Sequence, residues 1–330
     1  MYTDEDIASA VAAGVLSQET ATALRAHVDA LKHTTAADEE HFKLVTGFND
    51  IFVVIACVLL LASVAGIGAA FSSVMGAALT SLTAWLLAEF FVRQRRMALP
   101  AIVLLLAFVG GVFATGFFGF GSHKSVMPLT CMLAALAAWL HWRRFQVPIT
   151  IAAGTASALG FVIALILISF PEAMRWMTPI TFVAGLLAFW LAMRWDASDL
   201  RRESRRSDVA FWLHLLAAPM LVHPLFSLLG VLDGQATLAQ GLLIVLIYVM
   251  LALVSLCLDR RALMVSALGY VFYAFTALLK QYGVISLSFA ITALVIGSAL
   301  LLLSAFWHPS RAYVLGFVPA SIKEKLTPAR

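Results

Sequence analysis

The sequence predicts an all-α integral membrane protein with about ten transmembrane helices and with both termini in the cytoplasm. Of its 330 residues, 62% are hydrophobic and only 12% are charged, which is about half the charged fraction of an average soluble domain. A soluble fold of this length needs a polar exterior that this composition does not supply. Most Lys and Arg residues also lie in short segments between long apolar runs, as membrane topology requires.

Ten apolar runs account for most of the chain. A hydrocarbon core of about 30 Å is crossed by about 20 helical residues. The runs are continuously apolar rather than alternating, which favours helices over barrel strands. They cover residues 50–71, 73–91, 98–120, 125–140, 147–170, 177–195, 209–230, 237–258, 262–280 and 284–307. The second and fourth runs are short, and the turn at Ser72 and Ser73 leaves open that the first two runs form one broken hairpin.

The distribution of Lys and Arg among the loops predicts how the helices are oriented across the membrane. With ten spans and a cytoplasmic N-terminus, 19 of the 22 Lys and Arg residues fall on the cytoplasmic side, and only Lys124, Arg175 and Lys280 fall outside. This asymmetry holds at each loop in turn, so it tests the number of spans as well as their direction. Short loops and compact size suggest a bacterial source, so the predicted location is a bacterial inner (cytoplasmic) membrane.

Residues 1–49 are predicted to form a cytosolic helical hairpin and a linker. Thr3 and Ser17 are N-cap residues, and Gly14 is a helix stop. Ala21, Leu24, Val28 and Leu31 repeat at helical spacing and would form an apolar seam. The hairpin either packs on itself, a cytoplasmic loop or a second copy, or binds a partner protein. Residues 1–33 are therefore the candidate segment for a protein partner or for self-association.

The remaining segments are the ten-helix bundle, 50–307, and a tail, 308–330, which is too polar to span. An interfacial anchor is the predicted role of the tail. The three cysteines lie singly in apolar runs, so neither a disulfide nor a metal site is expected. No cofactor is expected either.

Ionisable groups at membrane depth are rare, and each is a candidate for function. His214 and His223 lie in the seventh run, nine residues apart, on nearly opposite faces of an ideal helix. Pro219 and Pro224 can break or bend that helix. One interpretation is that His223 contacts a substrate or a proton beside a kink, as in transporters with interrupted helices. The other is that both histidines bind neighbouring helices across a bent span.

Three further residues complete the candidate substrate or proton pathway. Glu89 stands four residues before Arg93, which is ion-pair spacing on a helix. Instead of serving a pathway, Glu89 can therefore form a structural ion pair with Arg93. Tyr270 and Tyr273 offer hydroxyl groups inside the bundle. No Ser/His/Asp order, zinc motif or phosphate loop is present, so no catalytic residues are predicted, and the protein is not expected to be an enzyme.

Arginines are densest between the sixth and seventh runs. They can bind anionic lipid headgroups, or they can act only as determinants of topology. The residues concerned are Arg201, Arg202, Arg205 and Arg206. Because the basic residues follow membrane topology, nucleic acid is not an expected partner.

The order of these parts resembles that of uncharacterised bacterial predicted membrane proteins. In those proteins a short helical hairpin with a Gly-hydrophobic-hydrophobic-Ser/Thr turn precedes many spans. The matching residues here are the turn Gly14-Val-Leu-Ser17 and the stretch Gly47-Phe-Asn-Asp-Ile-Phe52. Ten spans with both ends inside are also similar, in number alone, to the drug/metabolite transporters. Neither resemblance implies an activity or site residues.

Two functions follow as hypotheses. The first is a transporter-like bundle for a small molecule, because a proline-containing span carries histidine and little of the chain lies outside the membrane. The second is a non-transporting scaffold or assembly factor that binds its partners through the N-terminal hairpin.

Overall fold

The computed structural model describes residues 4–24, 48–121, 123–200, 202, 204–229, 238–281, 288–319, 323 and 326. These residues form helices and turns, and no strand occurs among them. The chain divides into two compact units, Met1–His41 and Phe42–Arg330.

The first unit contains helix α1 (Asp4–Ala12) and a second helical segment, residues 18–24. Gly14 has a φ of 72°, the left-handed conformation that glycine adopts readily after a helix. Ser17 then caps the second segment, because its Oγ accepts a hydrogen bond of 3.1 Å from the Thr20 N–H. The predicted turn and this cap are confirmed. Ala21 is buried, but Leu24 is 40% exposed, so Leu24 is not part of a buried seam among the described residues. Thr3, Val28 and Leu31 lie outside the described residues.

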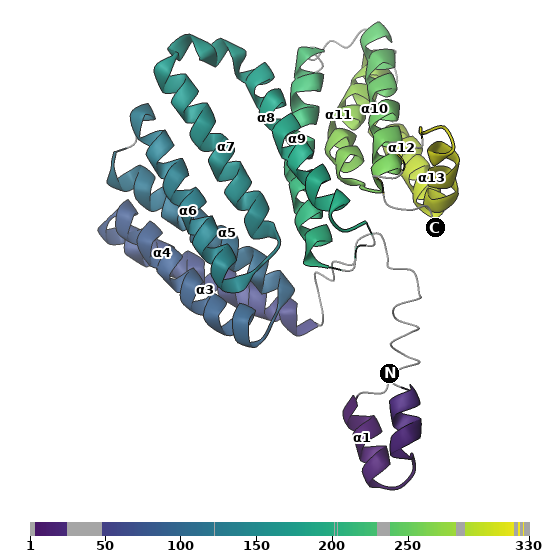
Figure 1. Ribbon diagram of the computed structural model, residues 1–330. Coiled ribbons are helices and arrows are strands. Elements are labelled where there is room, and N and C mark those ends of the chain that lie inside the picture. Colours follow the sequence, from purple (N-terminus) through teal and green to yellow (C-terminus); the bar gives the residue numbers. More distant parts are fainter. Residues whose placement is uncertain are drawn as a thin grey trace. The chain divides into compact units, whose positions relative to one another are not determined.

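Each of the ten predicted runs corresponds to a helix of the second unit, and one further helix follows (Figure 1). In chain order the helices are α3 (Phe48–Phe71), α4 (Ser73–Ala88), α5 (Ala98–Gly119), α6 (Met127–Phe145), α7 (Ile149–Ser169), α8 (Met177–Ala197), α9 (Arg205–Leu228), α10 (Leu238–Leu258), α11 (Ala262–Gln281), α12 (Ser288–Ala305) and α13 (Trp307–Leu315).

Within the described residues, eight helices are long and apolar enough to cross a membrane, namely α3 to α10 with their short extensions. In α11, residues 262–276 form a shorter apolar helix. The helices α12 and α13 meet at a bend of 73°, and they make a ninth span only if the bent pair is counted as one. The structure therefore supports eight or nine spans by length and composition, and the predicted count of ten is not confirmed.

The turn at Ser72 separates two complete helices. Ser72 has an extended backbone, and its side chain accepts a hydrogen bond of 3.0 Å from the Met75 N–H, which caps α4. So tight a turn brings α3 and α4 very close together. A Cβ atom on Gly68 would lie 2.6 Å from the Cα atom of Gly76, so only glycine fits at this crossing.

The second and fourth runs are longer in the structure than in the sequence analysis. The helix of α4 continues as a π-helical segment, η1 (Glu89–Gln94), and α6 extends to Phe145. Both extensions carry charged side chains, and hydropathy alone does not assign charged residues to a membrane span. Glu89 and Arg144 pair with each other there, so the charges are compatible with helix in both places.

Four helix-to-helix turns lie at one end of the second unit, which we call the arginine-rich end. They are the α4–α5, α6–α7, α8–α9 and α10–α11 turns. The Glu89–Arg144 pair connects the first two, and an Asp196–Arg260 pair connects the last two. One apolar cluster unites α6, α7, α8 and α9 at the same level. It includes Trp142, Ala152, Ala192 and Val209.

Each of these four turns contains one residue other than glycine in the left-handed region of backbone conformation. These residues are Arg96, Gln146, Arg202 and Asp259, with φ angles of 54°, 54°, 55° and 58°. Such values are uncommon for side chains other than Asn and Asp. The shared conformation reverses the chain in a few residues, and it keeps α4–α5, α6–α7 and α8–α9 closely packed along their lengths.

Helix α9 has the largest buried fraction of the eight candidate spans, and it packs against α7, α8 and α11. It is a continuous helix from Arg205 to Leu228 although it contains Pro219 and Pro224. The interpretation that these prolines interrupt the helix is therefore wrong for this structure. Ser204 caps α9 by accepting a hydrogen bond of 3.3 Å from the Arg206 N–H, which moves its start four residues ahead of the predicted one.

The halves of the helices away from the arginine-rich end are less closely packed. Helices α7 and α8 make few contacts with each other, and an apolar groove of about 360 Å³ lies between Ile163 and Val183. A second groove, of about 460 Å³, lies over α3, α4 and α5 near Gly110. These two grooves thus lie toward the end of the second unit opposite the arginine-rich end.

The tail differs from its prediction. Residues Trp307–Leu315 form α13, which packs against α10 with Trp307, Arg311 and Leu315 buried. Tyr313 is exposed on the other side of the helix. The face of α13 that carries Tyr313 can contact a membrane surface, whereas the face with Trp307, Arg311 and Leu315 is buried against the bundle.

Candidate functional site

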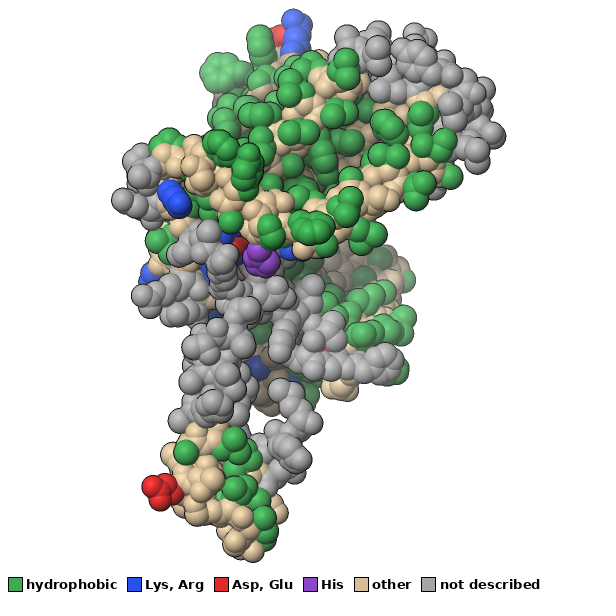
Figure 2. Space-filling model, turned by 90° about the vertical axis from the view of Figure 1, so that its right-hand side faces the viewer, with side chains coloured by type: hydrophobic (Ala, Val, Ile, Leu, Met, Phe, Trp, Pro, Cys, Tyr) green, Lys and Arg blue, Asp and Glu red, His purple; other side chains and the backbone are tan. Residues whose placement is uncertain are grey.

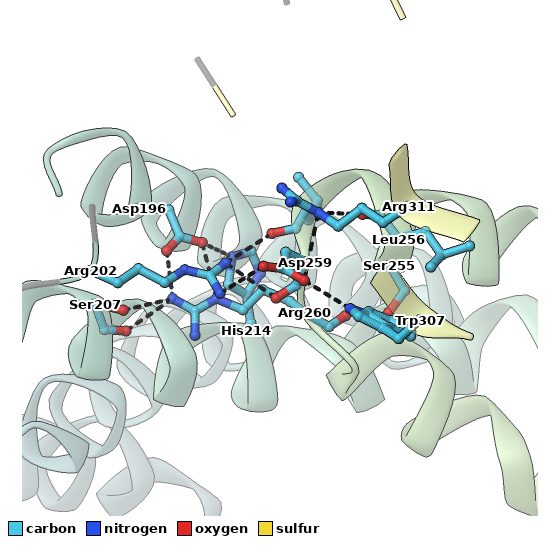
Figure 3. Close-up of polar contacts among 11 residues, drawn as sticks. Asp196, Arg202, Ser207, His214, Ser255, Leu256, Asp259, Arg260, Trp307 and Arg311 are labelled. Atoms are coloured by element: carbon cyan, nitrogen blue, oxygen red, sulfur yellow. Dashed lines mark hydrogen bonds and ion pairs between the residues drawn. The ribbon is translucent and has the colours of Figure 1, made fainter. Parts of the chain in front are cut away.

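A network of buried polar side chains joins the α8–α9 and α10–α11 turns at the arginine-rich end (Figure 3). Every charged member is less than a tenth exposed. The members are Asp196, Arg202, Ser207, His214, Asp259, Arg260, Trp307 and Arg311. Buried charges are stable only when paired and hydrogen-bonded, and the geometry meets that condition through two carboxylates.

The first carboxylate belongs to Asp196, at the end of α8. Its Oδ1 accepts a hydrogen bond of 2.6 Å from Arg260 Nη2, and its Oδ2 lies 2.8 Å from Nε2 of His214. Arg260 also donates to the backbone carbonyl and the hydroxyl of Ser207, at 3.1 and 3.2 Å. One aspartate therefore connects α8, α9 and the α10–α11 turn.

The second carboxylate belongs to Asp259, directly after α10. Its Oδ2 pairs with Arg202 Nη1 at 3.1 Å, and its Oδ1 accepts a hydrogen bond of 2.8 Å from the Trp307 indole N–H. The same Oδ1 lies 3.6 Å from Arg311 Nε, which donates to the carbonyl of Leu256. This aspartate connects the α8–α9 loop, the α10–α11 turn and α13.

Local backbone conformation places the second pair. Arg202 and Asp259 both have left-handed backbones, which turn their side chains toward each other across the two loops. Burial lowers the pKa of the Arg202 guanidinium from its usual value, and nearby Arg260 lowers it further, whereas Asp259 opposes the change. Because an arginine starts from a pKa above 12, it keeps its charge at neutral pH.

A second polar pair lies in the other half of α9. His223 Nδ1 is 2.6 Å from the Tyr270 hydroxyl of α11. Phe226 stacks on the Tyr270 ring at a centroid distance of 5.0 Å and an interplanar angle of 12°. The His223 side chain is exposed, and Tyr273, one turn further along α11, is 42% exposed. The structure thus brings together two of the predicted site residues and places a third next to them.

His214 and His223 are apart, as their nine-residue spacing predicts. His214 is buried against α8 by Asp196, while His223 faces Tyr270 on α11. Each histidine therefore binds a neighbouring helix, and they do not form a joint site. Nδ1 of His214 has no hydrogen-bond partner among the described residues.

Glu89 is at a third location, between α4 and α6. The predicted pair with Arg93 is confirmed at 3.4 Å. A stronger partner comes from α6, because Arg144 Nε and Nη2 contact the two carboxylate oxygens at 2.7 and 3.0 Å. This two-pronged geometry is the preferred one for arginine and carboxylate. Glu89 thus fastens two turns of the arginine-rich end, as the structural interpretation of this residue predicts.

His141 was not among the predicted site residues, yet it is completely buried on α6. Its Nδ1 lies 3.2 Å from the Thr150 hydroxyl of α7. The rings of Trp85, Phe108 and Phe145 surround it at centroid distances of 4.6 to 6.2 Å. Nε2 of His141 has no partner among the described residues. Its place four residues before the end of α6 made it look like a loop residue.

The network around Asp196 and Asp259 was not predicted either. Both aspartates end a long apolar run and adjoin arginine-rich segments. An acidic residue at the cytoplasmic end of an apolar run can indicate a buried ion pair, since the positive-inside rule accounts only for Lys and Arg at that end. The partners were not identifiable, because they are 18 to 64 residues away along the chain.

The predicted lipid contacts are corrected at one position. Arg202 is buried in its pair with Asp259, so it faces protein rather than a headgroup. Arg205 and Arg206 are exposed, and for them lipid binding stays a prediction. Arg201 lies outside the described residues.

Comparison of the chain with protein-family models, with curated proteins and with solved structures finds no match. The resemblance to bacterial predicted membrane proteins therefore stays a prediction. In the part of the chain that the structure describes, no group of three or more His, Cys, Asp or Glu side chains is placed to hold a metal ion.

Proposed function

We propose that the chain is a multi-pass protein of a bacterial inner membrane, in which α3 to α12 cross the bilayer and the arginine-rich end faces the cytoplasm. The apolar exterior supports insertion: Leu60, Leu246 and Leu301 are exposed on three different helices, and Figure 2 shows hydrophobic side chains spread over the face that it views. With 20 and 18 residues, α11 and α12 also approach the span of a hydrocarbon core.

Single cysteines in a cysteine-free background test this topology. In intact cells, a membrane-impermeant maleimide is expected to label Lys124→Cys, and also Val284→Cys in the segment between α11 and α12. Arg206→Cys and Lys323→Cys are expected to react only after the membrane is permeabilised. If positions 284 and 323 react from the same side, then α12 does not cross and the ten-span topology is wrong.

Within this topology we infer a transporter-like function for a small molecule, and the His223–Tyr270 pair is the observation that carries the proposal. Ionisable side chains within a span tend to serve ion or substrate pathways. His223 stands five residues before the end of α9, about 7 Å from it. It is exposed and hydrogen-bonded to a tyrosine hydroxyl, so the two groups can exchange hydrogen bonds or a proton with a bound molecule.

The packing of the described helices differs between the two ends of the second unit. The buried network around Asp196 and Asp259 ties the helices together at the arginine-rich end. The grooves between α7 and α8 and over α3–α5 lie in the opposite halves of the helices. Neither groove is lined by His223 or Tyr270, so the transport proposal rests on the pair itself.

Flux measurements in vesicles test the transport proposal. For a compound that wild-type vesicles take up, His223→Ala and Tyr270→Phe are expected to reduce the initial rate by about 100-fold or more, the lower end of the range for loss of an acid–base group. His123→Ala, in an exposed loop, is the matched control and should leave the rate unchanged.

Equal rates in all three variants would exclude a role for the pair. An absence of uptake across a broad panel of compounds would favour the alternative, a non-transporting scaffold or assembly factor. That alternative is supported by the separate N-terminal unit, Met1–His41, whose hairpin has its own turn and cap, and by the unbroken course of α9.

A further inference from the structure

A narrow apolar groove runs between α11 and α12 at the arginine-rich end of the second unit. Its volume is about 100 Å³. Its walls are hydrocarbon, from Val265 and Leu268 on α11 and from Leu300 and Leu303 on α12. Arg261, the residue before α11, lies at one end of the groove beside Trp307. The groove therefore combines an apolar channel with one fixed cation.

The position of the Arg261 guanidinium is set by its neighbours. Its Cζ atom lies 4.7 Å from the centroid of the Trp307 ring, which is cation–π geometry. Trp307 is only 2% exposed, and its N–H is held by Asp259 at 2.8 Å. The buried network therefore fixes the ring, and the ring orients the arginine. A planar guanidinium held in place is well suited to binding a phosphate.

Depth along the helix favours one kind of occupant. Arg261 precedes the first residue of α11, at the boundary between polar and apolar sequence. Leu268 lies seven residues further, about 10 Å deeper along the helix. A phospholipid in the adjacent leaflet has the same order, with phosphate at the boundary and hydrocarbon beneath it.

We propose that this groove, with Arg261 at its mouth, is a binding site for an anionic phospholipid of the leaflet at the arginine-rich end. The phosphate pairs with Arg261, and part of one acyl chain lies between α11 and α12. The excess of arginines at this end of the bundle attracts a negatively charged headgroup. The proposal rests on the membrane topology proposed above and is independent of transport. It moves the predicted lipid contact from Arg202, which is buried, to Arg261.

Lipid retention by the purified full-length protein tests the site. Native mass spectrometry in detergent compares phosphatidylglycerol with phosphatidylcholine. The wild type is expected to retain phosphatidylglycerol preferentially, and Arg261→Gln should weaken its binding about fivefold, which corresponds to about 1 kcal/mol for one arginine. Arg261→Lys keeps the charge and should retain most of the preference. Val265→Trp, which fills the groove, should weaken binding although Arg261 is intact.

Arg194→Gln is the matched control. Arg194 lies in the last turn of α8 and also stacks on a tryptophan, with its Cζ atom 5.1 Å from the Trp190 ring. It does not line the groove between α11 and α12, so its loss should leave the binding of phosphatidylglycerol unchanged. Equal loss in the Arg194 and Arg261 variants, or none in either, would overturn the proposal. Displacement of the lipid by glycerol phosphate at equal concentration would also overturn it, since that molecule has no acyl chain. The cysteine-labelling experiment reports on topology separately, so a failure of either proposal can be recognised.

Discussion

Asp259→Asn is expected to destabilise the protein by about 3–5 kcal/mol, the range for breaking a buried ion pair on one side. The substitution leaves the positive charges of Arg202 and Arg311 buried without their shared carboxylate. Asparagine suits the left-handed backbone at φ 58°, and its amide oxygen can still accept the hydrogen bond from Trp307. The main change in Asp259→Asn is therefore the loss of the negative charge. Equilibrium unfolding in mixed micelles, followed by circular dichroism, measures the effect.

A double variant separates pairing from a general loss of packing. Arg202→Met removes the charge that faces Asp259, and a buried pair replaced by neutral groups is often tolerated. Asp259→Asn combined with Arg202→Met should therefore be less destabilised than the sum of the single variants, with a coupling of about 1–3 kcal/mol. Glu172→Gln disrupts an ion pair whose side chains are 78–80% exposed and should leave the unfolding midpoint unchanged. Additive single variants would show that Arg202 and Asp259 are not energetically coupled.

Gly68→Ala is expected to destabilise the protein by about 1–3 kcal/mol, the usual range for overpacking. The new methyl group would lie 2.6 Å from the Cα atom of Gly76 and 2.8 Å from its nitrogen. These are backbone atoms, so no side chain can rotate to make room, and α3 and α4 must separate. The same unfolding measurement applies.

Gly66→Ala is the control on the same helix. A Cβ atom at Gly66 has no neighbour within 4 Å among the described residues. Alanine also has a higher helix propensity than glycine, by about 0.5–1 kcal/mol, so this variant should be as stable as the wild type or slightly more stable. If Gly66→Ala and Gly68→Ala behave alike, then the close crossing of α3 and α4 does not exist.

Much of the architecture follows from the sequence, because apolar periodicity and loop charge are local properties. Each predicted run corresponds to a helix, and the Ser72 turn divides two of them. The errors lie at helix ends. The predicted runs end at residues 91 and 140, yet helix continues to Gln94 and Phe145. Arg144, beyond the second of these ends, pairs with Glu89. Pro219 and Pro224 appear as breaks, yet packing on three sides keeps α9 continuous.

The candidate site was predictable only in part. His223 and Tyr270 were identified separately, because ionisable and hydroxyl groups in apolar runs are conspicuous. Their contact was not predictable, since it joins residues 47 positions apart. His141 was missed because it lies just beyond the apolar run, residues 125–140, that contains most of its helix.

By itself, the sequence determined the helical class, the approximate positions of the helices, the clustering of arginines at alternate turns and the hairpin turn at Gly14. These features depend on neighbouring residues and on the partition of side chains between water and hydrocarbon. Only the tertiary structure decided which arginines are buried. Arg202, Arg260 and Arg261 look alike in the sequence, but two lie in aspartate pairs and the third stacks on Trp307 beside a groove. Burial and pairing depend on which distant segments meet, and no local pattern encodes that.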